Sequence, residues 1–276
     1  MAIKVYKRNN SGRRNMSIVK PENVTDKKPE KSLVVAFNRK YGRSNGKISV
    51  RHKGGGAKRL YRKVDFVQNK LDILGTVVAI EKDPNRSALI ALVVYADGEK
   101  RYILATEDMK SGDKVMCSKE ASIKTGNRTK LSRIPTGTVI SSIEMKKGKG
   151  SQIVRSAGSG AMLMSMDDKY AHIKMPSGEI RLINIECYAT IGQVSNFEHN
   201  TVKIGKAGRA RRMGKRPAVR GSAMNPVDHP HGGGEGRQPI GLKYPKTPWG
   251  RPALGVRTRK KNKISNKYIV KSRHKK

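Results

Sequence analysis

The chain has 276 residues and is strongly basic, with 60 Lys and Arg against 21 Asp and Glu and a formal net charge of +39. Such a charge predicts a polyanionic partner, and no apolar run approaches the roughly 20 residues that span a bilayer, which argues against a membrane protein. The two cysteines, Cys117 and Cys187, form no CxxC pair. This argues against a disulfide scaffold and a zinc ribbon. We expect buried thiols in a reducing cytoplasm, since residues 1–20 also lack the apolar stretch of a secretory signal.

The charge is concentrated at both ends of the chain. Residues 1–63 hold 19 basic and 3 acidic side chains, residues 64–200 hold 19 and 16, and residues 201–276 hold 22 and 2. A nearly neutral middle between two basic arms is typical of a protein that grips a nucleic acid. Because the arms contain few apolar residues, we expect them to be largely disordered until bound. A free tail of this length would reach far from the core.

A run of glycines in the N-terminal arm is the first candidate for a binding site. The sequence RHKGGGAKRLYR, at residues 51–62, places three glycines between basic side chains. Glycine lets a backbone approach phosphates closely, and successive N–H groups can form a concavity that binds anions. A flexible linker is the alternative, but the flanking charges favour RNA. The predicted RNA-binding residues here are Arg51, His52, Lys53, Gly54, Gly55, Gly56, Lys58, Arg59 and Arg62.

The middle of the chain predicts β-structure. Apolar runs at residues 73–81, 88–95 and 100–106 are separated by Asp83-Pro84-Asn85 and by Asp97-Gly98, the pattern of two hairpins. A second set of short runs follows between residues 137 and 194, and strands so closely spaced favour small closed barrels over a βαβ fold. We expect barrels at residues 64–128 and 129–200, with basic extensions at residues 1–63 and 201–276.

The C-terminal arm begins with the densest basic cluster, which includes a predicted short helix from about residue 206 to residue 213. No acidic residue occurs between residues 201 and 223, whereas a merely solvated face usually mixes both signs. The planar fork of arginine suits contacts with phosphates and bases. The predicted RNA-binding residues of this cluster are Lys206, Arg209, Arg211, Arg212, Lys215, Arg216 and Arg220.

A loop with the sequence MNPVDHPHGGGEGR follows at residues 224–237 and can hardly build a core. Its His229 and His231 are too few as firm ligands for a metal site, and no partner is spaced to make His229 a catalytic base, although it is the one catalytic candidate. We favour contacts of both rings with bases, phosphates or 2′-hydroxyls. Asp228 and Glu235 then pair with arginines or with RNA-associated Mg²⁺ through water, and no other cofactor is expected.

Two further residues complete the predicted site. Arg237 closes the histidine loop, and Trp249 lies in the sequence TPWG. An exposed indole can stack on a base, and it can equally anchor the tail against a barrel. The sequence leaves both roles of Trp249 open.

The motifs also resemble a known family. The run GKAGRARRMGKRPAVRGSAMNPVDHPHGGGEGR at residues 205–237 is similar to the bacterial-type family of large-subunit ribosomal protein two, and RHKGGGAKRLYR, IPTGTVISSIE, RSAG, PSGE, ATIGQVSN, TPWG and NKYIV follow the family's order. Two positions depart from it. Arg212 stands where the family usually has an aromatic residue, and Lys130 stands where many relatives have proline.

This resemblance implies a fold and a function. It implies an oligonucleotide-binding-type barrel followed by an SH3-like barrel, with irregular extensions threaded through the large-subunit rRNA. The partners it implies are that rRNA, small-subunit rRNA at an intersubunit bridge, nearby tRNA and other ribosomal proteins. It implies a structural protein and not an enzyme, since a direct role in peptidyl transfer is disputed. A free single-strand binder is disfavoured because only Tyr95 and Tyr102 offer aromatic rings in the first barrel.

Overall fold

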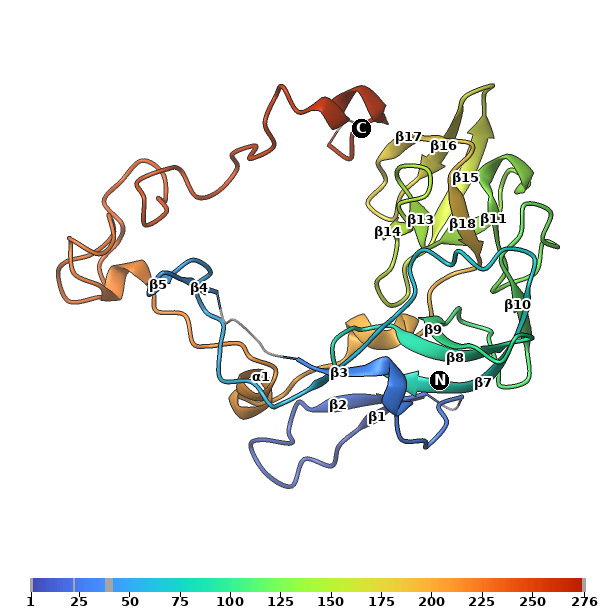
Figure 1. The fold of residues 1–276 in the computed structure, drawn as a ribbon. Coiled ribbons are helices and arrows are strands. Elements are labelled where there is room, and N and C mark those ends of the chain that lie inside the picture. Colours follow the sequence, from blue (N-terminus) through green and yellow to red (C-terminus); the bar gives the residue numbers. More distant parts are fainter. Residues whose placement is uncertain (1, 22, 38–41, 275–276) are drawn as a thin grey trace. The chain divides into compact units, whose positions relative to one another are not determined.

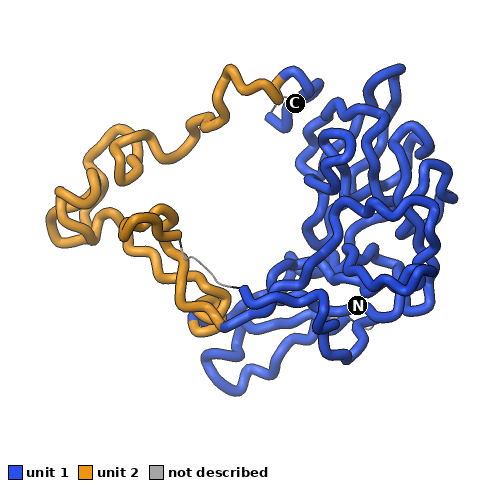
Figure 2. The backbone as a smooth tube through the Cα atoms, in the orientation of Figure 1, with its two compact units in different colours: residues 1–39, 58–207, 267–276 blue, residues 40–57, 208–266 orange. Residues whose placement is uncertain are grey.

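The computed structural model describes residues 2–21, 23–37 and 42–274. These residues form mostly β-strands, with a single α-helix among them, α1 (Ala207–Arg212). Figure 1 shows the fold. The chain divides into two compact units, unit 1 (residues 1–39, 58–207 and 267–276) and unit 2 (residues 40–57 and 208–266), which Figure 2 shows in different colours. The prediction of a mainly β fold is confirmed. Of the helices in the described part of the chain, none has the length and apolar character to cross a bilayer.

The first sheet of unit 1 is antiparallel, with the strand order β10-β7-β8-β9. Its strands are β7 (Leu74–Lys82), β8 (Leu89–Tyr95), β9 (Lys100–Leu104) and β10 (Lys114–Met116). Both predicted hairpins are confirmed, since β7 pairs with β8 and β8 with β9. In the second turn Gly98 has a φ of 81°, a conformation that costs glycine little.

Strand β8 is buried on both of its faces. Ala91 and Val93 belong to one apolar cluster, and Ile90 and Leu92 belong to another. Successive side chains of a strand point to opposite faces, so the two clusters lie on the two sides of the sheet. Because both faces of β8 are buried, successive residues of the run at residues 88–95 are all apolar.

The second sheet of unit 1 has seven strands, in the order β11-β18-β12-β15-β16-β17-β19. They are β11 (Arg128–Lys130), β12 (Val139–Ser141), β15 (Ala161–Met166), β16 (Tyr170–Lys174), β17 (Ile180–Asn184), β18 (Tyr188–Ile191) and β19 (Ile269–Lys271). A two-stranded sheet joins β13 (Ile143–Glu144) to β14 (Ser151–Ile153). Ile140, Leu163 and Ile173 lie fully buried in the core of this half.

A buried ion pair stabilises the second half of unit 1. Arg128 on β11 and Glu144 on β13 are 1% and 2% exposed, and the guanidinium donates to the carboxylate at 3.1 Å. Arg128 also donates to the carbonyl of Ser142 and to the hydroxyl of Ser151. The carboxylate accepts a further bond from the N–H of Gly150 at 3.1 Å. A charged side chain that is buried away from water is tolerated only when it is paired and hydrogen-bonded in this way.

Both cysteines lie inside unit 1 as free thiols. Cys117 is 4% exposed and Cys187 is fully buried. Burial raises the pKa of each thiol to about 11, because the thiolate is disfavoured away from water. The prediction that they act as small buried hydrophobes is confirmed.

The N-terminal extension carries short strands. They are β1 (Ala2–Val5), β2 (Ser17–Lys20), β3 (Val34–Ala36) and β6 (Leu60–Arg62), and β1 pairs with β2 and β3 with β6. The N–H of Glu30 donates to the hydroxyl of Tyr102, which in turn donates to the buried carboxylate of Glu81 at 3.0 Å. These contacts fix part of the extension on the first sheet.

The C-terminal extension is attached to unit 1 at both of its ends. The N–H of Lys203 donates to the hydroxyl of Ser17 at 2.8 Å, and the N–H of Ser17 donates to the carbonyl of Lys203 at 3.0 Å. At the other end β19 pairs with β17, and Tyr268 lies 6.2 Å from the ring of Tyr170. The extension is irregular over most of its length, as predicted, but it is a loop with two fixed ends. A loop reaches about half as far as a free tail of the same length.

Short 3₁₀ turns complete the secondary structure. They are η1 (Lys31–Leu33), η2 (Leu131–Arg133), η3 (Phe197–Thr201), η4 (Gly221–Ala223) and η5 (Ile264–Tyr268). Unit 2 also contains a small hairpin of β4 (Arg43–Ser44) and β5 (Lys47–Ile48). Unit 2 therefore has little regular structure and depends on turns and loop contacts.

Candidate nucleic-acid interface

Two basic segments that are far apart in the sequence lie side by side in unit 2. The N–H of Gly54 donates to the carbonyl of Gly214 at 3.0 Å, and the N–H of Arg216 donates to the carbonyl of His52 at 3.0 Å. The N–H of Ala57 donates to the carbonyl of Arg212 at 2.9 Å, and Lys53 forms a bridge with Lys215. The glycine segment and the arginine cluster are thus held together by their backbones, and Arg51, Lys53 and Arg216 line one groove.

The glycines give this pairing its backbone geometry. Gly54, Gly55 and Gly214 have φ values of 138°, 61° and 89°, a region that other residues occupy only with strain. A side chain at Gly55 would meet no atom within 4 Å, so the requirement there is conformational rather than steric. The segment therefore has a defined turn, which is more than a flexible linker would show. Its contact with phosphate stays a prediction.

The predicted RNA-binding residues differ in exposure and in unit. In unit 2, Arg209 and Arg211 are half-buried, and the exposed members are Arg51, His52, Lys53, Arg212, Lys215, Arg216, Arg220 and Arg237. Lys58, Arg59, Arg62 and Lys206 belong to unit 1. Arg59 donates to the carbonyl of Pro84 at 2.6 Å, so it also ties β6 to the first turn of the sheet.

The two units differ in how far acidic residues balance their positive charge. In unit 1 carboxylates pair with neighbouring cations, as Glu186 does with Lys130 at 2.7 Å and Asp65 with Arg101 at 2.7 Å. Between residues 201 and 266 the sequence contains only Asp228 and Glu235 as acids. Positive charge in unit 2 is therefore far from balanced within the chain, and it attracts an external polyanion.

The histidine loop is compact and is held by its own polar groups. The N–H groups of Asp228 and His229 both donate to the carbonyl of Asn225, at 3.0 and 3.2 Å. The N–H of His231 donates to Nδ1 of His229 at 3.0 Å, and the two rings lie 4.6 Å apart. Nε2 of His231 accepts a bond from the N–H of Lys246 at 2.7 Å. Both imidazoles thus act as acceptors that stabilise the loop.

His229 is buried rather than presented at the surface. Its exposed fraction is 7%. Burial, followed by the charges of His231 and Arg51, lowers the pKa of His229 below its usual 6.5. A folded-state pKa below the unfolded value means that the neutral ring stabilises the loop fully above pH 6.5, and that this stability is lost as the pH falls through the lowered pKa. A direct contact of this ring with RNA would first require the loop to open.

The loop also depends on close packing at Gly232. A Cβ at this position would overlap the backbone carbonyl of Asn225. We expect Gly232→Ala to destabilise the loop by about 1–3 kcal/mol, the usual cost of overpacking, and to speed hydrogen exchange at the N–H groups of His229 and Gly233. Gly208→Ala is the matched control, because a Cβ there meets no atom within 4 Å. Equal exchange rates in the two variants would contradict this packing.

Trp249 lies in unit 2 and is 74% exposed. The guanidinium carbon of Arg51 lies 5.2 Å from the centre of the indole ring, a cation–π contact. The contact joins the TPWG segment to the glycine segment. Stacking of the free face of Trp249 on a base stays a prediction.

Sequence reasoning missed a second group of arginines, which lies in unit 1. Arg86 and Arg155 approach the ring of Phe66 at 5.7 and 4.7 Å. Arg86 follows the turn after β7, and Arg155 follows β14, so tertiary structure alone brings them together. The basic character of each was visible in the sequence, but nothing there indicated that they converge.

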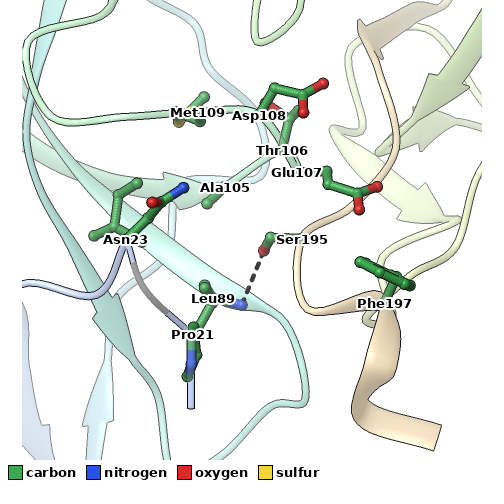
Figure 3. Close-up of a pocket in the computed structure, with 11 residues that line it drawn as sticks. Pro21, Asn23, Leu89, Ala105, Thr106, Glu107, Asp108, Met109, Ser195 and Phe197 are labelled. Atoms are coloured by element: carbon green, nitrogen blue, oxygen red, sulfur yellow. Dashed lines mark hydrogen bonds between the residues drawn. The ribbon is translucent and has the colours of Figure 1, made fainter. Parts of the chain in front are cut away.

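A cavity of about 190 Å³ in unit 1 is unsuited to nucleic acid. It is lined by Ile80 and Leu89 of the first sheet, by residues 21, 23 and 105–109, and by Ser195 and Phe197. Figure 3 shows the hydrogen bond that the N–H of Leu89 donates to the hydroxyl of Ser195, whose length is 3.2 Å. The lining residues in the described part of the chain include Glu107 and Asp108 but no basic side chain. Burial, and then the like charge of Asp108, raises the pKa of Glu107. Phosphates would be repelled here.

Two protein-family models match the chain. Residues 30–117 match the model described as Ribosomal Proteins L2, RNA binding N-terminal domain, and this match includes the glycine segment. Residues 124–250 match the model described as Ribosomal Proteins L2, C-terminal domain, which includes the arginine cluster and the histidine loop. The two matches follow each other in family order and take in most of the chain. The chain therefore belongs to the ribosomal protein L2 family, whose members are structural, RNA-binding proteins of the ribosome.

Proposed function

We propose that the chain is a primary binder of large-subunit rRNA that organises the RNA near the peptidyl transferase centre. In this role it supports subunit association, tRNA binding and peptide-bond formation without supplying a catalytic group. The supporting observation is the backbone pairing of the glycine segment with the arginine cluster, which gathers exposed cations on one part of unit 2. Phosphate contacts from such a surface supply most of the affinity for RNA.

The remaining parts of the proposal concern partners and organisation. The β-structured segments at residues 64–128 and 129–200 form the folded platform, and the basic extensions at residues 1–63 and 201–276 enter the RNA. Small-subunit rRNA at an intersubunit bridge, nearby tRNA and other ribosomal proteins are the further partners. The protein acts in the ribosome in the cytoplasm.

Within this proposal His229 maintains the shape of the loop and takes no part in the chemistry. Its Nδ1 accepts the N–H of His231, its ring is 7% exposed, and its lowered pKa keeps it neutral. A catalytic base would need a reachable nucleophile or substrate, and the buried ring offers no such access. The loop then serves as a rigid element beside the arginine cluster.

Reconstitution of large subunits tests both the function and this role of His229. Particles lacking the chain should fail in subunit joining. Particles with His229→Asn should assemble and retain most peptidyl transfer, because the Asn amide oxygen can accept the N–H of His231, while His229→Ala should show a modest assembly defect only. A loss of several orders of magnitude in peptidyl transfer by fully assembled particles of both variants would instead make the imidazole part of the reaction.

A further inference from the structure

A groove of about 310 Å³ lies within unit 2, between the hairpin segment and the chain that follows the arginine cluster. Its walls come from residues 43–53 and 216–224. The described lining residues are Arg43, Ile48, Val50, Arg51, His52, Lys53, Arg216, Pro217, Val219 and Met224. The groove therefore combines aliphatic and cationic side chains and contains no carboxylate among them.

The aliphatic side chains that line the groove, which we call its floor, are open to solvent. Ile48, Val50 and Val219 are 61%, 46% and 61% exposed. Single exposed aliphatic residues are ordinary, but a cluster in a concavity indicates a surface that becomes covered. Unit 2 is rich in charged side chains, and these aliphatic residues do not form a hydrophobic core within it.

The backbone beneath the floor is held in place. The carbonyl of Gly42 accepts the N–H of Ser49 at 2.7 Å and the N–H of Val50 at 2.9 Å. Gly42 has a φ of 58°, and a Cβ there would press on Val50. Because of this tight turn, the groove exists before any partner binds, which reduces the entropy cost of binding.

The groove is also lined by four cationic side chains, which we call its rim: Arg43, Arg51, Lys53 and Arg216. The guanidinium carbon of Arg51 lies 5.2 Å from the centre of the Trp249 indole ring, and this contact holds the side chain at the groove. A guanidinium can stack on a base or bind a phosphate in a bidentate manner.

We propose that this groove receives one unstacked nucleotide of the rRNA, with the base on the aliphatic floor and the neighbouring phosphates on the cationic rim. The inference rests on the proposed function and assigns a specific pocket to it. A base has flat apolar faces, and its phosphates are anionic, so floor and rim match the two parts of a single nucleotide. An apolar peptide would fit the floor but would leave the four cations of the rim unpaired, which favours RNA.

The test uses the full-length chain bound to protein-free large-subunit rRNA. Val219→Ser changes the floor, and Val227→Ser is the matched control, since Val227 is 96% exposed and does not line the groove. We expect Val219→Ser to weaken binding about fivefold to tenfold, the range of one lost base contact, with an unchanged dependence on salt. One unpaired base that is protected from chemical modification by the wild type should become reactive in the Val219→Ser complex.

Two results would overturn the inference. Affinity and base reactivity equal to those of the wild type and of Val227→Ser would show that no base occupies the groove. Normal rRNA binding by Val219→Ser combined with poor entry into reconstituted particles would assign the groove to a protein partner. The proposed function itself fails on a different result, namely wild-type binding that shows neither preference for large-subunit rRNA nor dependence on salt. Failure of the groove inference and failure of the proposed function can therefore be told apart.

Discussion

Replacing Arg209, Arg211 and Arg216 together by Ala should strongly weaken binding to large-subunit rRNA and lower its salt dependence. Each phosphate contact contributes about 0.7–0.9 to the slope of log affinity against log salt, so the slope should fall by about 2–3. The physical reason is that fewer counterions are released when the protein neutralises fewer phosphates. Filter binding or fluorescence anisotropy across a salt series measures both effects.

A charge-matched control separates this local effect from that of net charge. Lys124, Lys146 and Lys149 are exposed in the nearly neutral middle of the chain, and their joint replacement by Ala removes the same charge. We expect the slope of this control to stay close to that of the wild type. If both triple variants lose the same slope, long-range attraction rather than a contact surface explains the binding. If the arginine variant keeps its slope, these arginines do not contact phosphates.

Removing the carboxylate of Glu144 should destabilise unit 1 by about 3–5 kcal/mol, because it leaves the guanidinium of Arg128 buried without a counter-charge. Arg128 is fully buried and cannot turn to solvent. The N–H groups of Gly150 and Tyr188 also lose an acceptor. Burial lowers the pKa of Arg128, because the charged form is disfavoured away from water, and the charge of Glu144 opposes this shift. Denaturant unfolding of Glu144→Ala measures the change in the free energy of unfolding.

Glu186 supplies the control for this measurement. Its carboxylate pairs with Lys130 at 2.7 Å and Lys147 at 3.2 Å, but its side chain is 39% exposed. Water and salt screen such a pair, so Glu186→Ala should lower the free energy of unfolding far less than Glu144→Ala does. A small and equal cost for both variants would mean that the Arg128 site relaxes or admits water. In that case the buried pair would not be a main support of the second half of unit 1.

Local patterns predicted some of this protein well. The hairpin turns at residues 83–85 and 97–98 and the burial of both cysteines follow from side-chain type and short-range spacing. The excess of cations at both ends likewise needs no structure, because it is a property of composition. Family membership also followed from ordered motifs in the sequence.

Other features lacked any local signal. Arg128 stands at an expected domain boundary, and nothing near it in sequence indicates that Glu144 neutralises it. The strand β19 lies in a basic tail, and only its pairing with β17 reveals it as part of a sheet. His229 lies in a loop of proline, glycine and polar residues and is predicted from the sequence to contact RNA, whereas the closed turn from Asn225 to Gly233 buries it.

The sequence by itself determined that this is a mainly β, RNA-binding protein with basic extensions, since charge, short apolar runs and turn residues act over a few positions. The tertiary structure alone decided how residues 51–57 meet residues 212–216, how the groove between Val50 and Val219 forms, and which arginines share a surface. Those contacts are backbone hydrogen bonds and packing between irregular segments far apart in the chain. Such contacts have no periodicity, because any residue can supply the N–H and carbonyl groups that form them.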